Sequence, residues 1–389
     1  MIDNVASFLK NSKTVSPKEI IDIVKKKELK RNVWSIKNEI SPSDLYCYFY
    51  LRFGVPNGIQ NFLRADDSDN LIHWDWTLVY SDRLLTILGM NFRTEIHFID
   101  CDDKVSFTKD DFIAFLKEDI DRFKVQISKM QKEKLEEWDV FVNPFYQLEE
   151  SIEQLFCDLK DLKLDPLKEK LPDLSSQLDL KKFREEFDLL ASRYYKGAGL
   201  SLSLKMMIPV LAEAFINLLI YILARDDVRN NERLFNSFFR EQIDVRIQSL
   251  HLKCKGFIKE VNWSEEPCKK YNSIVNQRND LLHGNVSIDT RKISEVFFNG
   301  RVPLFKKYET MWQRSIGISI ETSGFLEVES NYEIVKAFIE YVKSCLDLSV
   351  RKQIDIIFGM RDLGRNRKTN KIGVLFPNHL VDFFSHVGD

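Results

Sequence analysis

The stretch IPVLAEAFINLLIYIL, residues 208–223, predicts a helix at the centre of a hydrophobic core. Glu213 and Asn217 are its only strongly polar residues, and a spacing of four places them on one helix face. Extended to the flanking residues 206–224, the segment approaches the roughly 20 residues of a membrane-spanning helix. We expect a core helix because Pro209, Glu213 and Asn217 interrupt it, no second comparable segment exists, and a mid-bilayer acid is costly.

Further along the chain, residues 276–285 read NQRNDLLHGN, within a segment that is otherwise typical of a core-building helix. A helix turns by about 100° per residue, so Arg278 and His283 lie about 140° apart on its surface. Asn279 falls directly below His283 on one face. The Arg and the His therefore flank a groove on this helix.

Arg278 also falls on the apolar stripe of the same helix, three residues after Val275 and four before Leu282. A guanidinium cannot be desolvated without a partner. The stripe must therefore open at this point onto a cleft, a carboxylate or a second subunit. Gly284 allows the helix to end there, which leaves the imidazole of His283 near an edge.

An Arg and a His in this arrangement suit the cleavage of RNA. Imidazole transfers protons near neutral pH, and a guanidinium is a planar donor for a phosphate that develops extra charge. RNA carries its own nucleophile, the 2′-hydroxyl, so one proton-transfer group and one phosphate clamp suffice without a metal or cofactor. The spacing alone is weak, because an Arg, four residues and a His occur by chance in many proteins.

The string RNDLLHG, residues 278–284, together with the apolar helix upstream, resembles the signature of the HEPN superfamily of helical antiviral and toxin ribonucleases. The resemblance covers roughly residues 185–360. It implies a metal-independent endoribonuclease that acts by 2′-hydroxyl transesterification, in phage defence, abortive infection or a toxin system. It also implies a homodimer whose two Arg-His motifs meet at the interface, which would explain the place of Arg278 on an apolar stripe.

The resemblance assigns roles to four residues. His283 would shuttle the proton and Arg278 would bind the scissile phosphate. Asn279 would hydrogen-bond the phosphate or hold His283, and Glu213 would orient the Arg or the His, with Asn217 the weaker candidate. The implied partners are RNA, with transfer RNA among the candidates, and a phage-derived trigger or an antitoxin.

A second reading stays open, in which the bundle is a non-catalytic HEPN-like module that dimerises and binds RNA or protein. Arg278 would then be a structural ion-pair donor and His283 a surface residue that ends a helix. Glu213 and Asn217 would be a buried hydrogen-bonded pair that fixes packing.

Composition bounds the remaining expectations. A net charge of −2 over 389 residues argues against a surface coated for nonspecific nucleic-acid binding, so an RNA site must be a local patch. We predict that patch in the C-terminal segment, where the candidate RNA-binding residues are Arg351, Lys352, Arg361, Arg365, Arg367 and Lys368. A solvated basic tail is the commoner explanation of such a run of charges. The arginines between Arg225 and Arg246 alternate with acids and are typical of an exposed helix face.

The cysteines and the first residues predict a cytoplasmic protein with no membrane association. The six cysteines, at positions 47, 101, 157, 254, 268 and 345, form no Cys-x-x-Cys pair and have no His at ligand spacing. They predict reduced, mostly buried thiols and no metal site. Residues 1–10 lack the basic and apolar pattern of a secretory signal.

The expected fold is mainly α, with a C-terminal HEPN-like helical bundle preceded by a smaller α+β domain. Residues 1–140 would regulate the enzyme or sense a trigger, residues 141–177 would form a helical linker, and residues 178–389 would form the ribonuclease domain. In the first domain we expect an antiparallel meander of three strands at residues 72–80, 84–88 and 94–99, followed by a long charged helix at residues 108–138. In the bundle we expect helices at residues 180–195, 209–224, 232–261, 266–283 and 332–358. We also expect a hairpin insert within residues 296–328, with residues 315–320 as one of its strands.

Overall fold

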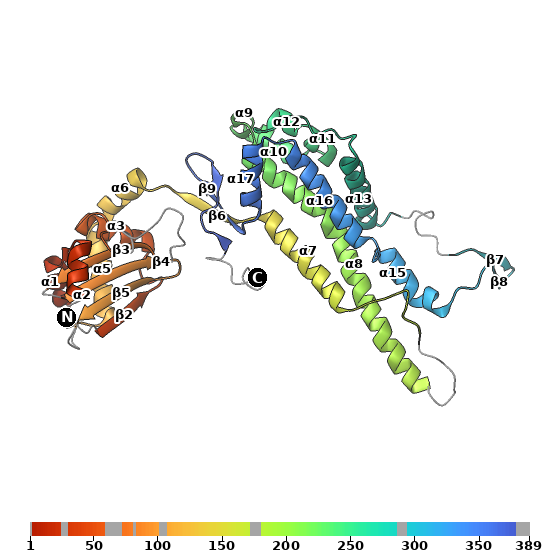
Figure 1. Cartoon of the computed structure of the whole chain (residues 1–389), viewed down its shortest axis with the longest axis horizontal. Coiled ribbons are helices and arrows are strands. Elements are labelled where there is room, and N and C mark those ends of the chain that lie inside the picture. Colours follow the sequence, from red (N-terminus) through yellow and green to blue (C-terminus); the bar gives the residue numbers. More distant parts are fainter. Residues whose placement is uncertain are drawn as a thin grey trace. The chain divides into compact units, whose positions relative to one another are not determined.

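The computed structural model describes residues 2–24, 30–58, 72–80, 83–100, 107–171, 180–285 and 294–378. The chain forms two compact units that divide between Asp139 and Val140 (Figure 1). The first unit also contains Asn366–Asn370, and the second also contains Lys371–Asn378. Helices predominate over small antiparallel sheets, so the predicted mainly α class is confirmed.

A five-stranded antiparallel sheet forms the centre of the first unit. The expected meander is confirmed as β3 (Ile72–Tyr80), β4 (Arg83–Met90) and β5 (Thr94–Asp100). Two strands that we did not predict extend it, β1 (Lys13–Thr14) along β3 and β2 (Lys30–Ile36) along β5. The order is β1-β3-β4-β5-β2, so segments that precede the meander in the chain close both of its edges.

Two helices of the first unit begin at residues whose side chains cap them. In α3, the Ser41 side chain accepts a hydrogen bond from the backbone N–H of Asp44. In α5, Thr108 and Asp111 form a capping box. The long charged helix that we expected divides at Phe123 into two helices. The bounds are Ile2–Asn11 for α1, Pro17–Val24 for α2, Pro42–Phe53 for α3, Lys109–Arg122 for α5 and Lys124–Lys134 for α6.

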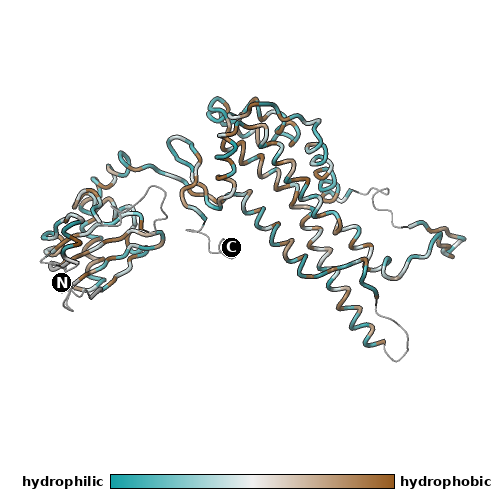
Figure 2. Tube along the Cα trace, viewed as in Figure 1, coloured by the Kyte–Doolittle hydropathy of each residue, from teal (hydrophilic) through white to brown (hydrophobic). Residues whose placement is uncertain are grey.

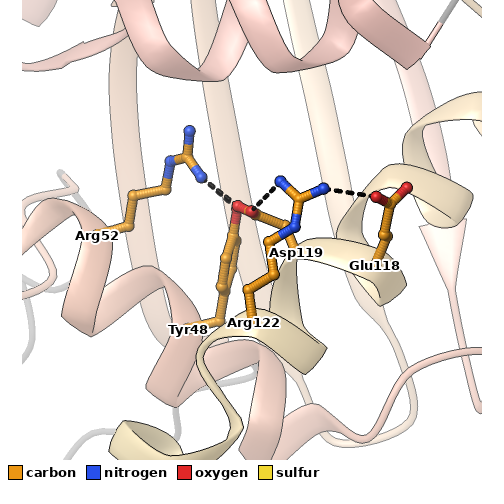
Figure 3. A network of polar contacts seen from close by, with 5 residues as sticks. All are labelled: Tyr48, Arg52, Glu118, Asp119 and Arg122. Carbon is orange, nitrogen blue, oxygen red and sulfur yellow. Dashed lines mark hydrogen bonds and ion pairs between the residues drawn. The ribbon is translucent and has the colours of Figure 1, made fainter.

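A polar network lies among the aromatic side chains of this unit and joins α3 to α5 (Figure 3). The Tyr48 hydroxyl donates to Asp119 Oδ2 at 2.7 Å, and Arg52 Nη1 donates to both the Tyr48 oxygen and Asp119 Oδ2. Arg122 Nη1 lies 3.7 Å from Asp119 Oδ1. Burial raises the pKa of Tyr48, and its hydrogen bond to Asp119 raises it further. The buried carboxylate of Asp119 is thus fully engaged.

We predict that Asp119→Ala lowers the free energy of unfolding of the first unit by about 3 kcal/mol, because it leaves Arg52 and Tyr48 without their acceptor. Asp121→Ala, on the exposed face of the same helix, is the control and should stay within about 0.5 kcal/mol. Urea titration of the full chain, with hydrogen exchange of the β3–β5 amides as readout, measures both. Equal exchange rates in the two variants would contradict the prediction.

The second unit is a helical bundle around one long helix, α8 (Leu180–Leu223). Among the described residues, the helices that pack most extensively against α8 are α7 (Pro144–Asp161), α13 (Glu266–Leu282), α15 (Ile318–Ser323) and α16 (Val328–Ser344). The other elements of the unit are α9 (Asp226–Arg229), α10 (Glu232–Arg240), α11 (Ile243–Gln248), α12 (Leu250–Lys253), a π-helix (Gln313–Gly317), α17 (Leu348–Phe358), and the hairpin β7 (Val296–Asn299) and β8 (Val302–Phe305). The chain also forms a small sheet of β6 (Trp138–Val142), β9 (Asp362–Asn366) and β10 (Ile372–Gly373).

The apolar stretch at residues 208–223 is the buried core helix that the sequence predicts. Ile208, Leu211, Phe215 and Leu219 are completely buried. By length and composition α8 could cross a membrane, but over half of its most apolar window is buried inside the unit, and one such helix does not indicate a membrane protein. We expected two helices here, and the structure has one, because Pro209 lies inside α8 without ending it.

The sequence predicts a linker at residues 141–177, but the first half of this segment is part of the bundle. Phe145 and Ile152 of α7 are buried against α8. Asn143 is completely buried; its Oδ1 accepts from two N–H groups of the first turn of α7, and its Nδ2 donates to the Phe358 and Met360 carbonyls at 3.1 and 2.9 Å. A linker was the wrong interpretation here. Residues 172–177 and Cys101 lie outside the described residues.

Three other predictions for the bundle were wrong. Residues 232–261 form three short helices, and the predicted helix 332–358 is interrupted where Asp347 caps α17. Residues 315–320 are helical, since Ile316 and Ile320 are also four apart and are buried together near Ala191. The hairpin insert is confined to Val296–Phe305.

Candidate functional site

The two strongly polar residues in the apolar stretch of α8, residues 208–223, each bind an arginine from a different helix. Glu213 Oε1 accepts a hydrogen bond and ion pair from Nη2 of Arg278, on α13. Asn217 Oδ1 accepts from Arg246 Nη1, on α11, at 2.7 Å. One face of α8 therefore anchors both neighbouring helices through polar contacts inside an apolar bundle.

Arg278 lies on the buried side of α13, as its place on the apolar stripe predicts. Only 15% of its side chain is exposed, against 27% for Glu213. Of the three partners that the sequence left open, a cleft, a carboxylate or a second subunit, the structure supplies the carboxylate. The Nε of Arg278 is buried and has no hydrogen-bond partner in the described part of the chain. Its guanidinium is therefore held from one side only.

Arg246 is a part of this site that sequence reasoning missed. We assigned it to an exposed helix face, but it is 8% exposed. Burial lowers its pKa, and Glu213 opposes that shift through its negative charge. Arg246 Nη2 also donates to the Glu241 carbonyl at 2.7 Å. The available signal was Asn217, a half-buried amide within an apolar stretch, although nothing in the sequence identifies its partner.

Tyr271 completes the group, seven residues before Arg278 on α13. It is completely buried; burial raises its pKa and the charge of Glu213 raises it further, while Arg278 lowers it. Its hydroxyl donates to the Pro209 carbonyl at 3.4 Å, and its ring stacks on Phe338 with centroids 4.3 Å apart. We refer to Glu213, Asn217, Arg246, Tyr271 and Arg278 as the polar cluster.

His283 lies outside the polar cluster. It is the C-cap of α13; its backbone N–H bonds to the Asn279 carbonyl at 2.9 Å, and Gly284 follows with φ of +62°, as a helix end requires. The prediction that Gly284 ends the helix is confirmed. The side chain is exposed, and within the described residues no hydrogen bond reaches its imidazole. Glu213 therefore contacts Arg278 and not His283.

Asn279 is half-buried beside Arg278, and its side chain makes no hydrogen bond to the described residues. Of the four predicted catalytic residues, the structure thus joins Arg278 and Glu213, whereas the side chains of His283 and Asn279 make no hydrogen bond to the described residues. No protein-family model, curated protein or solved structure matches this chain. The description of the site therefore rests on its own geometry.

The predicted C-terminal RNA-binding patch is largely neutralised. Arg351 pairs with Glu340 at 2.8 Å, Arg361 with Asp362 at 2.9 Å, and Arg367 with Asp139 and Glu137. Arg365 also has an interaction partner. Lys352 and Lys368 are exposed, and among the described residues no acid pairs with them. Three of the six cations thus pair with acids, so the run of cations overstates the free positive charge.

A double-mutant cycle tests the central ion pair. We predict that Glu213→Gln and Arg278→Met are coupled by about 1–3 kcal/mol in unfolding free energy, because each leaves a half-buried partner unpaired. The control is Glu266→Gln with Lys270→Met, an exposed pair on the same helix at 3.3 Å, whose coupling should be below about 0.5 kcal/mol. Equal coupling in the two cycles would show that the Arg278 pair is only a surface contact.

Proposed function

We propose that this protein is a HEPN-like endoribonuclease that cleaves RNA by transesterification from the 2′-hydroxyl, with no metal. One observation carries the proposal: an arginine fixed by a carboxylate of the core helix lies five residues before an exposed histidine whose imidazole makes no hydrogen bond to the described residues. A purely structural role accounts for the ion pair of Arg278, but it assigns no role to the exposed imidazole of His283.

In the proposed mechanism, Arg278 binds the scissile phosphate and offsets the charge that develops on it. His283 removes the proton from the 2′-hydroxyl, whose oxygen attacks phosphorus. The bond from phosphorus to the 5′-oxygen breaks, this oxygen takes up a proton, and the products are a 2′,3′-cyclic phosphate and a 5′-hydroxyl. Glu213 keeps the guanidinium in one orientation, and Asn279 donates to the phosphate or holds His283.

The proposal includes a cytoplasmic homodimer in which two such motifs meet. Within one chain, His283 and Leu282 are exposed at the end of α13. A second copy would cover this apolar edge and add a second Arg and His to one RNA-binding groove. We place the protein in phage defence or a toxin system, with the first unit as its regulator and a phage-derived trigger or an antitoxin as its partner.

The first experiment compares wild-type protein with His283→Ala on total cellular RNA in excess chelator, with sequencing of 2′,3′-cyclic phosphate ends. We expect discrete cleavage by wild type and a loss of at least about 100-fold in rate for His283→Ala, the size of a missing acid–base group. Arg278→Lys should lose a similar factor, because an ammonium cannot replace the planar guanidinium.

The matched control is His251→Ala, a histidine of the same unit on α12, which should cleave as wild type does. Equal cleavage by wild type and His283→Ala would refute the assigned role. Intact RNA with wild-type protein, at concentrations where it binds RNA, would favour the non-catalytic binding module.

Dilution tests the homodimer. If the active groove needs two copies, the cleavage rate per chain should fall as the protein is diluted below its dimer dissociation constant. Sedimentation at the same concentrations measures the fraction of dimer, and the two curves should coincide. A rate per chain that is independent of concentration, with a monomer in sedimentation, would contradict the dimeric site.

A further inference from the structure

The hairpin of β7 and β8 carries large apolar side chains that are exposed to solvent. It is a sheet of two strands only, and it extends beyond the helices of its unit (Figure 1). Phe297, Phe298 and Tyr308 are 60%, 68% and 86% exposed. Figure 2 shows hydrophobic residues on both strands. An isolated two-stranded hairpin is marginally stable in water, and a concentrated apolar surface marks a binding site.

The strand register sorts these side chains onto two faces. Phe298 is opposite Pro303, and Val296 is opposite Phe305, so the rings of Phe298 and Phe305 share one face. Tyr308 follows β8, and its ring centroid lies 5.9 Å from that of Phe305. One face therefore carries an aromatic series, while the other carries Phe297 with the aliphatic side chains of Leu304 and Val302.

The hairpin also carries uncompensated positive charge. Its acids are already engaged, Glu295 with Lys306 and Glu309 with Arg314. Arg301 follows Gly300, which has a φ of +61° in the turn, and Lys307 follows β8. Both are exposed, and no acid of the described residues pairs with either. This excess contrasts with the net charge of −2 of the whole chain.

We infer that the hairpin binds single-stranded RNA, with bases stacked on Phe298, Phe305 and Tyr308 and phosphates contacting Arg301 and Lys307. Aromatic rings beside unpaired cations are the combination that single-stranded nucleic acids require. The charge favours a polyanion over an apolar protein surface, which would leave both cations without a partner. The inference rests on the proposed function for the identity of the polyanion, and makes the hairpin the arm that holds the substrate.

The test measures binding separately from cleavage. The full-length His283→Ala protein is titrated onto a fluorescein-labelled single-stranded RNA of about 15 nucleotides, and anisotropy reports the dissociation constant. The triple variant Phe298→Leu, Phe305→Leu, Tyr308→Leu keeps the hairpin apolar but removes the stacking rings. We expect it to bind at least about tenfold more weakly. Phe297→Leu, on the opposite face, is the control and should change binding less than twofold.

Salt dependence tests the phosphate contacts. Arg301→Gln with Lys307→Gln should reduce the slope of log affinity against log salt by about 1.4, which corresponds to two phosphates on a single strand. Lys306→Gln, a cation already paired with Glu295, should leave the slope nearly unchanged. Circular dichroism of each variant should match that of His283→Ala, since the substituted side chains are exposed.

Wild-type affinity in the triple leucine variant would overturn the inference. A triple serine variant at the same positions is the second check. If it changes the oligomeric state and leaves RNA affinity unchanged, the inference is also overturned, because the hairpin would then be a protein-docking surface. Hairpin-dependent RNA binding by a protein that never cleaves would refute the proposed ribonuclease and support this inference. Cleavage that does not depend on the hairpin would refute this inference and support the proposed ribonuclease.

Discussion

The burial of α8 is the constraint on which the second unit depends. An apolar helix packed on several sides must satisfy each polar group that it carries, because an unpaired buried carboxylate or amide is costly. Glu213 and Asn217 meet this requirement by binding Arg278 and Arg246. Those two contacts link α13 and α11 to the core helix, and α13 ends at the exposed His283.

The same arrangement separates a rigid half of the candidate site from an open half. Arg278, Tyr271 and Glu213 are held by packing and hydrogen bonds, whereas His283 caps the helix end and is exposed. A phosphate clamp benefits from a fixed guanidinium, and a proton-transfer group must reach a substrate that arrives from solvent. This geometry is consistent with the RNA cleavage that we propose, in which RNA or a second copy would complete the groove.

Positive charge in this protein is distributed differently from what the linear sequence indicates. The cations of the C-terminal segment are numerous, but three of the six that we named, Arg351, Arg361 and Arg367, pair with acids. The hairpin carries few cations, and two of them have no acidic partner among the described residues. Candidate RNA contacts therefore depend on which charges remain unpaired after folding, and not on the local density of Lys and Arg.

The sequence by itself determined the buried core helix, the meander and the end of α13 at Gly284, because these follow from local periodicity and from backbone preferences of single residues. It also identified Glu213 and Arg278 as polar residues in apolar surroundings. Only the tertiary structure decided that they bind each other, that Arg246 is buried on Asn217, and that α7 belongs to the core. These contacts join residues far apart in the chain, and no local pattern states which partner a buried charge will find.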